Sequence, residues 1–313
     1  MQKAVASQTS LVKSRPARFT LTAAARRRYI LFVLLVAPAF ALRLLTAAYP
    51  VFQTIALSLT NLDLIKNTND FVGLDNFTSM ANDFGVRGSL EFTLLFVFGS
   101  TFLAVGIGML IALLLNAAFF GRTFARTINL IPWVIPTIVA GYAFRWLLDD
   151  QFGLLPNWIF DTLGIRPAIF ISPFSARLAA ILVSSWKDAP FFAIVFLAGL
   201  QGVPLELYDA ATVDGANGWQ RFWHITFRLL LPLTVTMVMF RLVWALAGFD
   251  LVYGLTQGGP GVTTTVLALQ VFRQGILFFK FGFASAISVV LLLLVSIIGG
   301  VGLWLFRRTD VTY

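Results

Sequence analysis

The chain has 313 residues, of which 58% are hydrophobic and 12% are charged, with no cysteine, a single histidine and a net charge of +9. Soluble domains carry about 25% charged residues, whereas a charge at the centre of a membrane helix costs at least about 2.5–3.5 kcal/mol. The composition therefore predicts a polytopic membrane protein and excludes disulfides, thiolate metal sites and a cysteine nucleophile. With only His224 available, we expect neither a zinc site nor a Ser/His/Asp triad, so no catalytic or metal-binding residue is predicted.

The chain begins with a basic segment. Its first 62 residues contain no acid, and seven Lys or Arg precede Tyr29. A transit peptide or a signal peptide ending near Ala37 would carry similar charges, but the apolar stretch continues past that candidate cleavage site. We expect residues 1–28 to be a cytoplasmic tail that anchors the topology. The other basic residues are scattered between apolar stretches, which argues against nucleic acid as a partner.

Six apolar stretches approach the length of about 20 residues that a bilayer-crossing helix needs. They cover roughly residues 29–49, 92–115, 128–148, 178–200, 233–255 and 284–306. The predicted fold is an all-α membrane protein with one six-helix transmembrane domain at 29–306, followed by a cytoplasmic tail at 307–313. The sequence shows no tandem repeat and no second folded domain.

Positive charge sets the orientation of these spans. Thirteen Lys and Arg lie on the side of the membrane that holds the N-terminus, and six lie on the opposite side. Because cytoplasmic loops carry the excess of Lys and Arg, we expect the N- and C-termini in the cytoplasm. The segment 202–231 is then a cytoplasmic loop of a multi-pass protein.

That loop interrupts the apolar chain with a short charged, Ala-rich passage. Pro204 suits the first position of a helix and Gly215 its end, which predicts a helix of about ten residues. Such a short helix is marginal alone in water, so we expect it to dock on another surface. One face, at i, i+3, i+4 and i+7, consists of Leu207, Ala210, Ala211 and Asp214. A groove on a partner and the protein's own helix bundle explain this face equally well.

The second half of the loop predicts an amphipathic helix in the membrane interface. Its apolar face contains Trp219, Phe222, Trp223, Thr226, Phe227 and Leu230. Its other face contains Arg221, His224 and Arg228, and we expect His224 to be a bystander there. Pro232 is expected to mark the turn into the fifth span.

Ionisable residues inside spans are functional candidates. Lys187 and Asp188 point about 100° apart as neighbours on a helix, so each should have another partner. Arg241 and Asp250, nine residues apart in one continuous helix, should face opposite directions. Together with nearby aromatic residues, whose rings can stack on a sugar, the candidates for a solute path are Trp186, Lys187, Asp188, Arg241, Trp244, Asp250 and Tyr253. Salt bridges that hold the helix bundle together are the alternative role.

Several motifs, in order along the chain, resemble the permeases of binding-protein-dependent ABC importers. The run ELYDAA at 206–211, followed by DGA at 214–216 and LP at 231–232, resembles their cytoplasmic signature loop. FVGLDNF at 71–77, IPWVIP at 131–136, WKDAPF at 186–191 and the GGP turn at 258–260 resemble the sugar-permease branch of maltose and glycerol-phosphate type. Two positions depart from the pattern: Asp209 begins the E-A-A triplet, and Arg228 stands where many relatives have a proline.

The resemblance implies a type I ABC importer permease fold. It implies the membrane subunit of an ATP-driven importer that forms the translocation path for a sugar or sugar-like solute. The helix at 204–216 would couple to a separate ATPase through Glu206, Leu207, Tyr208, Asp209, Ala210, Ala211, Asp214, Gly215 and Ala216. The outer surface for the solute-binding protein would include Phe71, Gly73, Asn76, Gly258, Gly259 and Pro260.

The implied partners are a second homologous permease subunit, a dimer of cytoplasmic ATP-binding subunits and an extracytoplasmic solute-binding protein. The sequence contains no Walker motif, and the GGP turn lacks the Gly-Lys-Ser/Thr ending of a phosphate loop. No cofactor is therefore expected in this chain, and ATP and magnesium would bind to the partner ATPase. A secondary, ion-coupled transporter is the alternative, but it favours an inverted repeat and broken helices, which the sequence does not reveal.

Overall fold

The computed structural model describes residues 23–309, with side chains from 27 to 306. Within this range the protein is helical, apart from loops and three isolated β-bridges. The chain forms two structural units, Met1–Gln53 and Thr54–Tyr313. Most of the predicted N-terminal tail (residues 1–22) and the last four residues of the predicted C-terminal tail (310–313) lie outside the described residues.

Five helices are long and apolar enough to cross a membrane, and a bent helix pair makes a sixth span, within the described part of the chain. The first helix, α1, covers Ala23–Ser58 and begins before the predicted boundary at residue 29. The run AAARRR at 23–28 consists of good helix formers, so the helix extends into the basic segment. The other long spans are α3 (Phe84–Asn116), α8 (Pro173–Gln201), the helix at Gly218–Ala247 and α14 (Phe281–Thr309).

The third predicted span is broken rather than continuous. It consists of α4 (Arg122–Asn129), α5 (Ile131–Val134) and α6 (Thr137–Leu148), with a bend of 92° before α6. Pro136 causes the break, because it has no N–H to donate and it forces the preceding Ile135 into the extended region, at ψ 130°. The sequence alone did not reveal this break. A short helix, α7 (Leu154–Leu163), follows α6.

The fifth span also differs from its prediction. A helix runs from Gly218 to Ala247 through α10 (Gly218–Arg221), the π-helical turn η1 (Phe222–Thr226) and α11 (Phe227–Ala247). Pro232 lies inside α11 and does not mark a turn. The helix ends because Gly248 is extended, at ψ 136°, and a separate helix, α12 (Asp250–Thr256), follows. The predicted span at 233–255 therefore stops at Ala247. The chain continues through α13 (Leu267–Phe272) and the π-helical turn η2 (Arg273–Leu277) to α14.

Small residues let the helices of the second unit pack closely. Between α3 and α8, a Cβ on Gly108 would lie 2.6 Å from the Phe192 Cβ and 2.9 Å from the Ala189 carbonyl oxygen. Close backbone approach through small residues is how membrane helices associate without a hydrophobic driving force. The core beside this contact contains Ala104, Met109, Phe192, Phe196 and Leu200.

A second close contact joins α6 and α12. A Cβ on Gly254 would lie 2.7 Å from the Ile138 carbonyl oxygen, and one on Gly141 would lie 2.8 Å from the Leu251 carbonyl oxygen. This reciprocal arrangement, the α6–α12 glycine contact, holds two segments that are separated by about a hundred residues of sequence.

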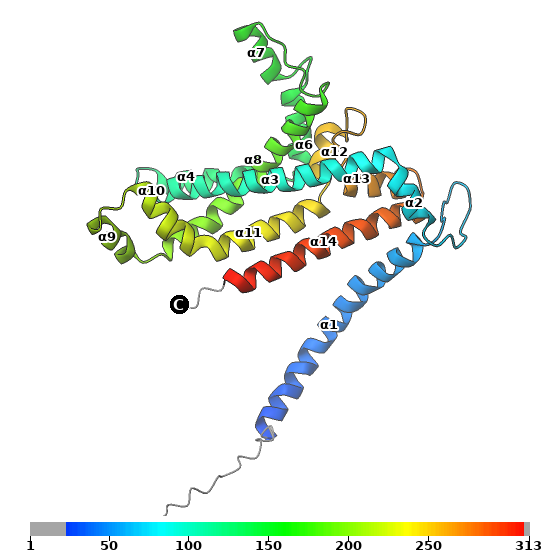
Figure 1. Ribbon diagram of the computed structural model, residues 1–313, viewed down its shortest axis with the longest axis horizontal. Coiled ribbons are helices and arrows are strands. Elements are labelled where there is room, and N and C mark those ends of the chain that lie inside the picture. The colour runs from blue at the N-terminus through cyan, green and yellow to red at the C-terminus, as the bar shows by residue number, and fades with distance from the viewer. Residues whose placement is uncertain (1–22, 310–313) are drawn as a thin grey trace, which may run out of the picture. The chain divides into compact units, whose positions relative to one another are not determined.

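The loops of the second unit lie at two opposite ends of its long helices. Figure 1 shows the start of α4, the helices α9 (Leu205–Val213) and α10 and the end of α14 at one end. The helices α2 (Asp75–Asn82), α12 and α13 lie toward the other end (Figure 1). This separation agrees with the sides of the membrane that the charge distribution predicts.

Candidate functional site

The charged, Ala-rich loop forms the short helix that the sequence predicts. It is α9, at Leu205–Val213, with Pro204 as its N-cap and Asp214 as its C-cap. Gly215 follows with a φ of +78°, a left-handed conformation that glycine adopts without strain. The helix therefore ends at the predicted place for the predicted reason.

One side of α9 is attached to the next helix of its own chain. The Tyr208 hydroxyl and the Thr226 Oγ1 lie 2.8 Å apart and share a hydrogen bond. One turn further along, Arg221 donates from Nη1 to the Thr212 Oγ1 at 3.0 Å. Thr226 is buried and belongs to the π-helical turn η1, so Tyr208 connects α9 to the inner end of α11.

A second part of the α9 surface, its free side, is exposed among the described residues. Leu205 is 74% exposed and Val213 is 88% exposed, and the carboxylates of Glu206 and Asp209 are exposed between them. Of the four residues of the predicted face, Leu207, Ala210 and Asp214 are exposed, whereas Ala211 is half-buried. The two readings of the short helix thus apply to different sides: one side packs on the protein's own bundle and the other is open.

The helix that follows is amphipathic as predicted, and it is continuous with the fifth span. A capping box begins it, since the Gln220 N–H donates to the Asn217 Oδ1 at 2.9 Å and the Asn217 N–H donates to the Gln220 Oε1 at 2.8 Å. Four rings form an aromatic cluster on one face, namely Trp219, Phe222, Trp223 and Phe227. The His224 Nδ1 lies 2.9 Å from the Gln220 carbonyl oxygen, one turn earlier in the same helix.

Two of the intramembrane charges pair with each other. Asp188 Oδ2 on α8 lies 2.8 Å from Arg241 Nη2 on α11, and their side chains are only 15% and 4% exposed. Arg241 also donates to the Ser184 hydroxyl at 2.8 Å and to the Ser100 hydroxyl at 3.4 Å. This ion pair joins α3, α8 and α11 at a buried point. Asp188 thus has a partner other than its neighbour Lys187, as the helical geometry predicts.

Lys187 has a different partner. Its Nζ donates to the Trp133 carbonyl oxygen at 3.3 Å. That carbonyl is free because α5 ends at Val134, before the break at Pro136, so no residue of a continuing helix bonds to it. The broken span therefore supplies a backbone acceptor for a cation inside the membrane.

Arg241 and Asp250 line one cavity, although one continuous helix would place them on opposite faces. The break at Gly248 reorients the chain, and the two side chains share a cavity of about 70 Å³ with Thr137, Asp188 and Trp244. A water molecule occupies about 30 Å³ in the liquid. The cavity therefore has room for a few waters.

Two of the predicted path residues lie elsewhere. Trp186 packs against Phe144, with ring centroids 4.8 Å apart, and lines an apolar cleft with Leu178 and Leu182. Tyr253 packs edge-on against Phe249 and Phe272, two rings that stack on each other beside the helix core. The structure therefore brings Asp188, Arg241, Trp244 and Asp250 together around one cavity, whereas Lys187, Trp186 and Tyr253 do not line it.

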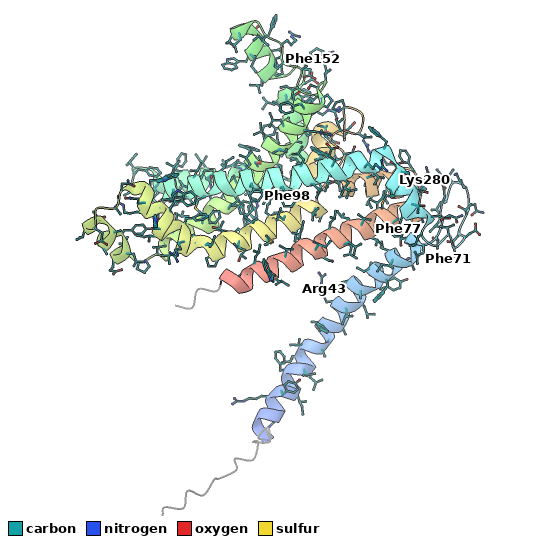
Figure 2. The ribbon with its side chains drawn as sticks, in the orientation of Figure 1. Arg43, Phe71, Phe77, Phe98, Phe152 and Lys280 are labelled. Atoms are coloured by element: carbon teal, nitrogen blue, oxygen red, sulfur yellow. The ribbon has the colours of Figure 1, made fainter. Side chains whose placement is uncertain are left out.

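The first predicted docking segment lies at the outer end of the second unit. Phe71 is 76% exposed, and Gly73 has a φ of +58°. Asn76 serves the fold, because its Nδ2 donates to the Ser58 and Thr60 carbonyls at 2.8 and 2.7 Å. Figure 2 shows Phe71, Phe77 and Lys280 at the same end of this unit.

The glycine turn is the second docking segment, and it is held firmly. Thr265 donates to the Gly258 carbonyl at 3.1 Å and Thr264 donates to the Gly259 carbonyl at 2.6 Å. Gly259 and Pro260 line an open cavity with Arg145 and Asp149, whereas Asn76 lines a different one with Lys66 and Lys280. The two segments therefore line different cavities.

Sequence reasoning missed the neutral partners of these sites. Ser100, Ser184 and Thr226 carry hydrogen bonds that fix Arg241 and Tyr208. Their only sequence signal is a hydroxyl within an apolar run, which many membrane helices contain. Among the described residues, no group of three or more His, Asp or Glu side chains could hold a metal ion.

These features define a class of protein: a membrane-embedded transport subunit, with spans joined by buried charges and a short helix presented at the inner end. Residues 104–311 match the model of the family described as "Binding-protein-dependent transport system inner membrane component", and the chain belongs to this family. It is therefore a multi-pass inner membrane protein and the non-catalytic permease subunit of an ABC importer, which functions together with other importer components. Family membership excludes the ion-coupled alternative.

Several named proteins are similar to this chain. The chain is 37% identical to the sulfoquinovosyl glycerol transport system permease protein SmoG of Agrobacterium fabrum, covering 90% of this chain and 92% of SmoG. It is 36% identical to the trehalose/maltose transport system permease protein MalF of Thermococcus litoralis, covering 84% and 88%. A solved structure of a bacterial alginate ABC transporter with an alginate pentasaccharide-bound periplasmic protein contains a chain with the same fold. The TM-score is 0.79 at 22% identity, with 92% and 97% of the two chains covered.

Proposed function

We propose that this permease carries a sugar or sugar-like solute across the membrane. The observation that supports this solute class most directly is the identity of the similar permeases, which are named for sulfoquinovosyl glycerol, trehalose/maltose and sn-glycerol 3-phosphate. The buried ion pair, the neighbouring Trp244 and the exposed Asp250 are consistent with it, because a sugar is bound by stacking and by hydrogen bonds together.

The importer would consist of this chain, a second homologous permease, a dimer of ATP-binding subunits and an extracytoplasmic solute-binding protein. ATP and magnesium bind to the ATP-binding subunits, and this chain needs no cofactor of its own. The binding protein docks on the outer end, where Phe71 is exposed and the GGP turn at 258–260 is rigid.

The helix α9 couples this permease to the ATP-binding subunit. Its free side offers two carboxylates, Glu206 and Asp209, between two exposed apolar residues, Leu205 and Val213. A partner groove with an apolar floor and a basic rim complements such a surface. The coupling residues at Tyr208 and Ala211 face the protein's own loop instead.

The attachment of α9 gives the coupling a mechanical route. Closure of the ATP-binding dimer displaces α9, and the hydrogen bond from Tyr208 to Thr226 carries that displacement to the inner end of α11. Arg241 lies on α11 and is paired with Asp188 on α8, so the movement reaches the buried ion pair between these spans. Alternating access then follows from the relative movement of α8 and α11.

The coupling role is tested by reversing one charge on the free side of α9. Asp209→Arg should reduce both recovery of the ATP-binding subunit with the purified complex and ATP-driven uptake. Asp161→Arg is the matched control, since it reverses an exposed helical carboxylate on α7. Full recovery and full uptake with Asp209→Arg would remove α9 as the coupling element.

The solute class is tested in proteoliposomes that contain the complete importer. Uptake of labelled sulfoquinovosyl glycerol, trehalose or maltose should require ATP and the solute-binding protein. An importer that hydrolyses ATP in response to its binding protein but takes up no carbohydrate would contradict the proposed solute class.

A further inference from the structure

Arg177 connects three segments at the outer end of the second unit. It lies in the first turns of α8, and its Nε donates a hydrogen bond to the Thr263 carbonyl oxygen at 2.9 Å. Its Nη1 lies 3.3 Å from the Glu91 Oε1 on α3, and its Cζ lies 5.9 Å from the centroid of the Phe92 ring on the same helix. The half-buried guanidinium thus lies between α3, α8 and the segment that contains Thr263.

Thr263 belongs to a turn at residues 258–265, which we call the outer turn and which includes the GGP turn at 258–260. The hydroxyls of three successive threonines donate back to three successive carbonyls of this turn. The acceptors are Pro260 for Thr263 at 2.8 Å, Gly259 for Thr264 at 2.6 Å and Gly258 for Thr265 at 3.1 Å. Because these bonds hold the outer turn together as one piece, a displacement of its glycines also displaces Thr263.

Arg177 attaches the outer turn to α8. Among the described residues, the bond from Arg177 to Thr263 is the only hydrogen bond between the outer turn and α8. Gly259 and Pro260 face the loop before α8 across an open cavity of about 320 Å³, which they line together with residues 170–171. The position of the outer turn relative to α8 therefore depends on the guanidinium of Arg177.

From this attachment, α8 extends to the cytoplasmic side. Asp188 follows Arg177 by eleven residues without an intervening proline, which is about 16 Å along the helix axis. Asp188 forms the buried ion pair with Arg241. The helix ends at Gln201, and α9 begins shortly afterwards at Leu205. One helix therefore leads from the outer turn past the buried ion pair to the short helix of the cytoplasmic loop.

The two acceptors of Arg177 explain why an arginine suits this position. Its planar guanidinium holds five N–H groups in a fixed arrangement, so it donates to Thr263 and to Glu91 at once. A hydrogen bond from a charged donor is about twice as strong as one between neutral groups. The ion pair contributes less, because the Glu91 side chain is 70% exposed and water screens surface pairs. The bond to the Thr263 carbonyl is therefore the contact that fixes the outer turn.

We propose that Arg177 is the positioning residue that transmits docking of the solute-binding protein on the outer turn to α8. The proposal rests on the proposed function, in which the binding protein docks at the GGP turn, and it assigns the transmission to one side chain. A binding protein that contacts the exposed Gly261 displaces the outer turn, and Arg177 draws the outer end of α8 with it. The movement reaches the ion pair at Asp188 and then α9 beyond the other end of α8.

The test measures ATP hydrolysis by the complete importer in proteoliposomes as the concentration of its solute-binding protein increases. The binding protein is loaded with sulfoquinovosyl glycerol, trehalose or maltose, and hydrolysis is expressed relative to the same vesicles without binding protein. Arg177→Gln removes the charge and the Nε donor, so the maximum stimulation should fall at least fivefold, the lower end of typical couplings between two sites. The half-saturating concentration of binding protein should stay within twofold of wild type, because the exposed surface of the outer turn is unchanged.

Three further variants show which contact of Arg177 matters. Arg177→Lys keeps the charge but reaches only one of the two oxygens, and it should lose less stimulation than Arg177→Gln. Glu91→Gln leaves the bond to Thr263 in place, and its maximum stimulation should stay within twofold of wild type. Arg166→Gln is the matched control and should also stay within twofold, since Arg166 is exposed and its guanidinium lies over the Phe160 ring at 4.8 Å.

The outcomes separate the proposal from a structural role and from the function on which it rests. Co-purification of the partner subunits is measured for each variant, and Arg177→Lys replaces Arg177→Gln if only the latter fails to assemble. Full stimulation of the assembled variant overturns the proposal, and so does a change confined to the half-saturating concentration, which would assign Arg177 to the docking surface. Failure of both variants to assemble makes Arg177 a folding residue and overturns it as well. If ATP hydrolysis by the wild-type importer does not respond to the binding protein, the proposed docking itself is wrong.

Discussion

Neutralising Asp188 should destabilise the permease strongly, because it leaves the charge of Arg241 buried. The Arg241 side chain is only 4% exposed, and its remaining partners are the hydroxyls of Ser184 at 2.8 Å and Ser100 at 3.4 Å. Its buried Nε has no hydrogen-bond partner among the described residues. The guanidinium in Asp188→Asn would therefore depend on two neutral hydroxyls and an amide.

The size of the loss follows from this geometry. Removal of one partner of a buried ion pair costs about 3–5 kcal/mol, because the other charge stays in a medium of low dielectric. Replacing both partners removes that penalty, and the double variant Asp188→Asn/Arg241→Met should lose clearly less than the sum of the two single variants. The interaction energy should be in the range of about 0.5–3 kcal/mol that double-mutant cycles give for residues in contact.

Equilibrium unfolding of the purified chain in mixed detergent micelles measures these free energies. Increasing SDS unfolds the helices, and tryptophan fluorescence reports the transition for wild type, both single variants and the double variant. Asp250→Asn is the control, because Asp250 lines the same cavity but is exposed. Strictly additive losses, or an Asp188→Asn variant as stable as wild type, would refute the role assigned to the ion pair.

Three further predictions follow from contacts elsewhere in the chain. Gly254→Val should lower the free energy of unfolding by about 1–3 kcal/mol in the same assay, because the new Cβ would lie 2.7 Å from the Ile138 carbonyl oxygen. Gly299→Val is the control and should change the free energy of unfolding little, because no atom lies within 4 Å of its Cβ. Tyr208→Phe should leave the Thr226 hydroxyl without its partner and lower the solute imported per ATP, and adding Thr226→Val should cause no further loss if the two residues act together. Hydrogen bonds from the backbone N–H groups of Lys66 and Ile65 hold the pKa of Asp63 below its usual value. The stability that Asp63 gives to the loop at 61–70 is therefore present above the unfolded pKa of about 3.9 and is lost as the pH falls through the lower folded pKa. Pepsin cleavage of this loop should increase below about pH 4 in the wild-type protein. The Asp63→Asn variant should not show this dependence on pH.

The sequence predicted the number of spans, the short loop helix and the family, because these depend on local signals. Apolar length, the Pro204 and Gly215 boundaries and the motif at 206–211 each act within a few residues. The separation of the loops at the two ends of the second unit agrees with the predicted orientation, which depends only on counts of charge (Figure 1).

The breaks were missed for a physical reason. Pro136 and Pro232 both occur in apolar runs, yet only the first interrupts the helix. In a membrane helix the effect of a proline depends on whether neighbouring groups satisfy the freed carbonyls, and the Lys187 ammonium does so beside Pro136. That contact joins residues that are far apart in sequence, so a local reading cannot distinguish the two prolines.

The candidate path shows the same limit. Helical spacing correctly separated Lys187 from Asp188, but it assumed one helix through Arg241 and Asp250 and therefore placed them apart. The path residues Trp186 and Tyr253 were chosen for their aromatic character, and packing turns them toward other rings. Which aromatic residues pack against one another depends on how α5, α8 and α11 are arranged in three dimensions. No local sequence pattern records that arrangement.

The α6–α12 glycine contact has a consequence for how this subunit can change shape. Because the two backbones are in direct contact, no side chains lie between α6 and α12 on which they could slide. The two helices must therefore move together as one rigid body. Each of them starts directly after a break in the helical chain, α6 after Pro136 and α12 after Gly248 and Phe249. The chain can bend at these two breaks. The rigid body formed by α6 and α12 can therefore rotate while the hydrogen bonds within both helices stay intact.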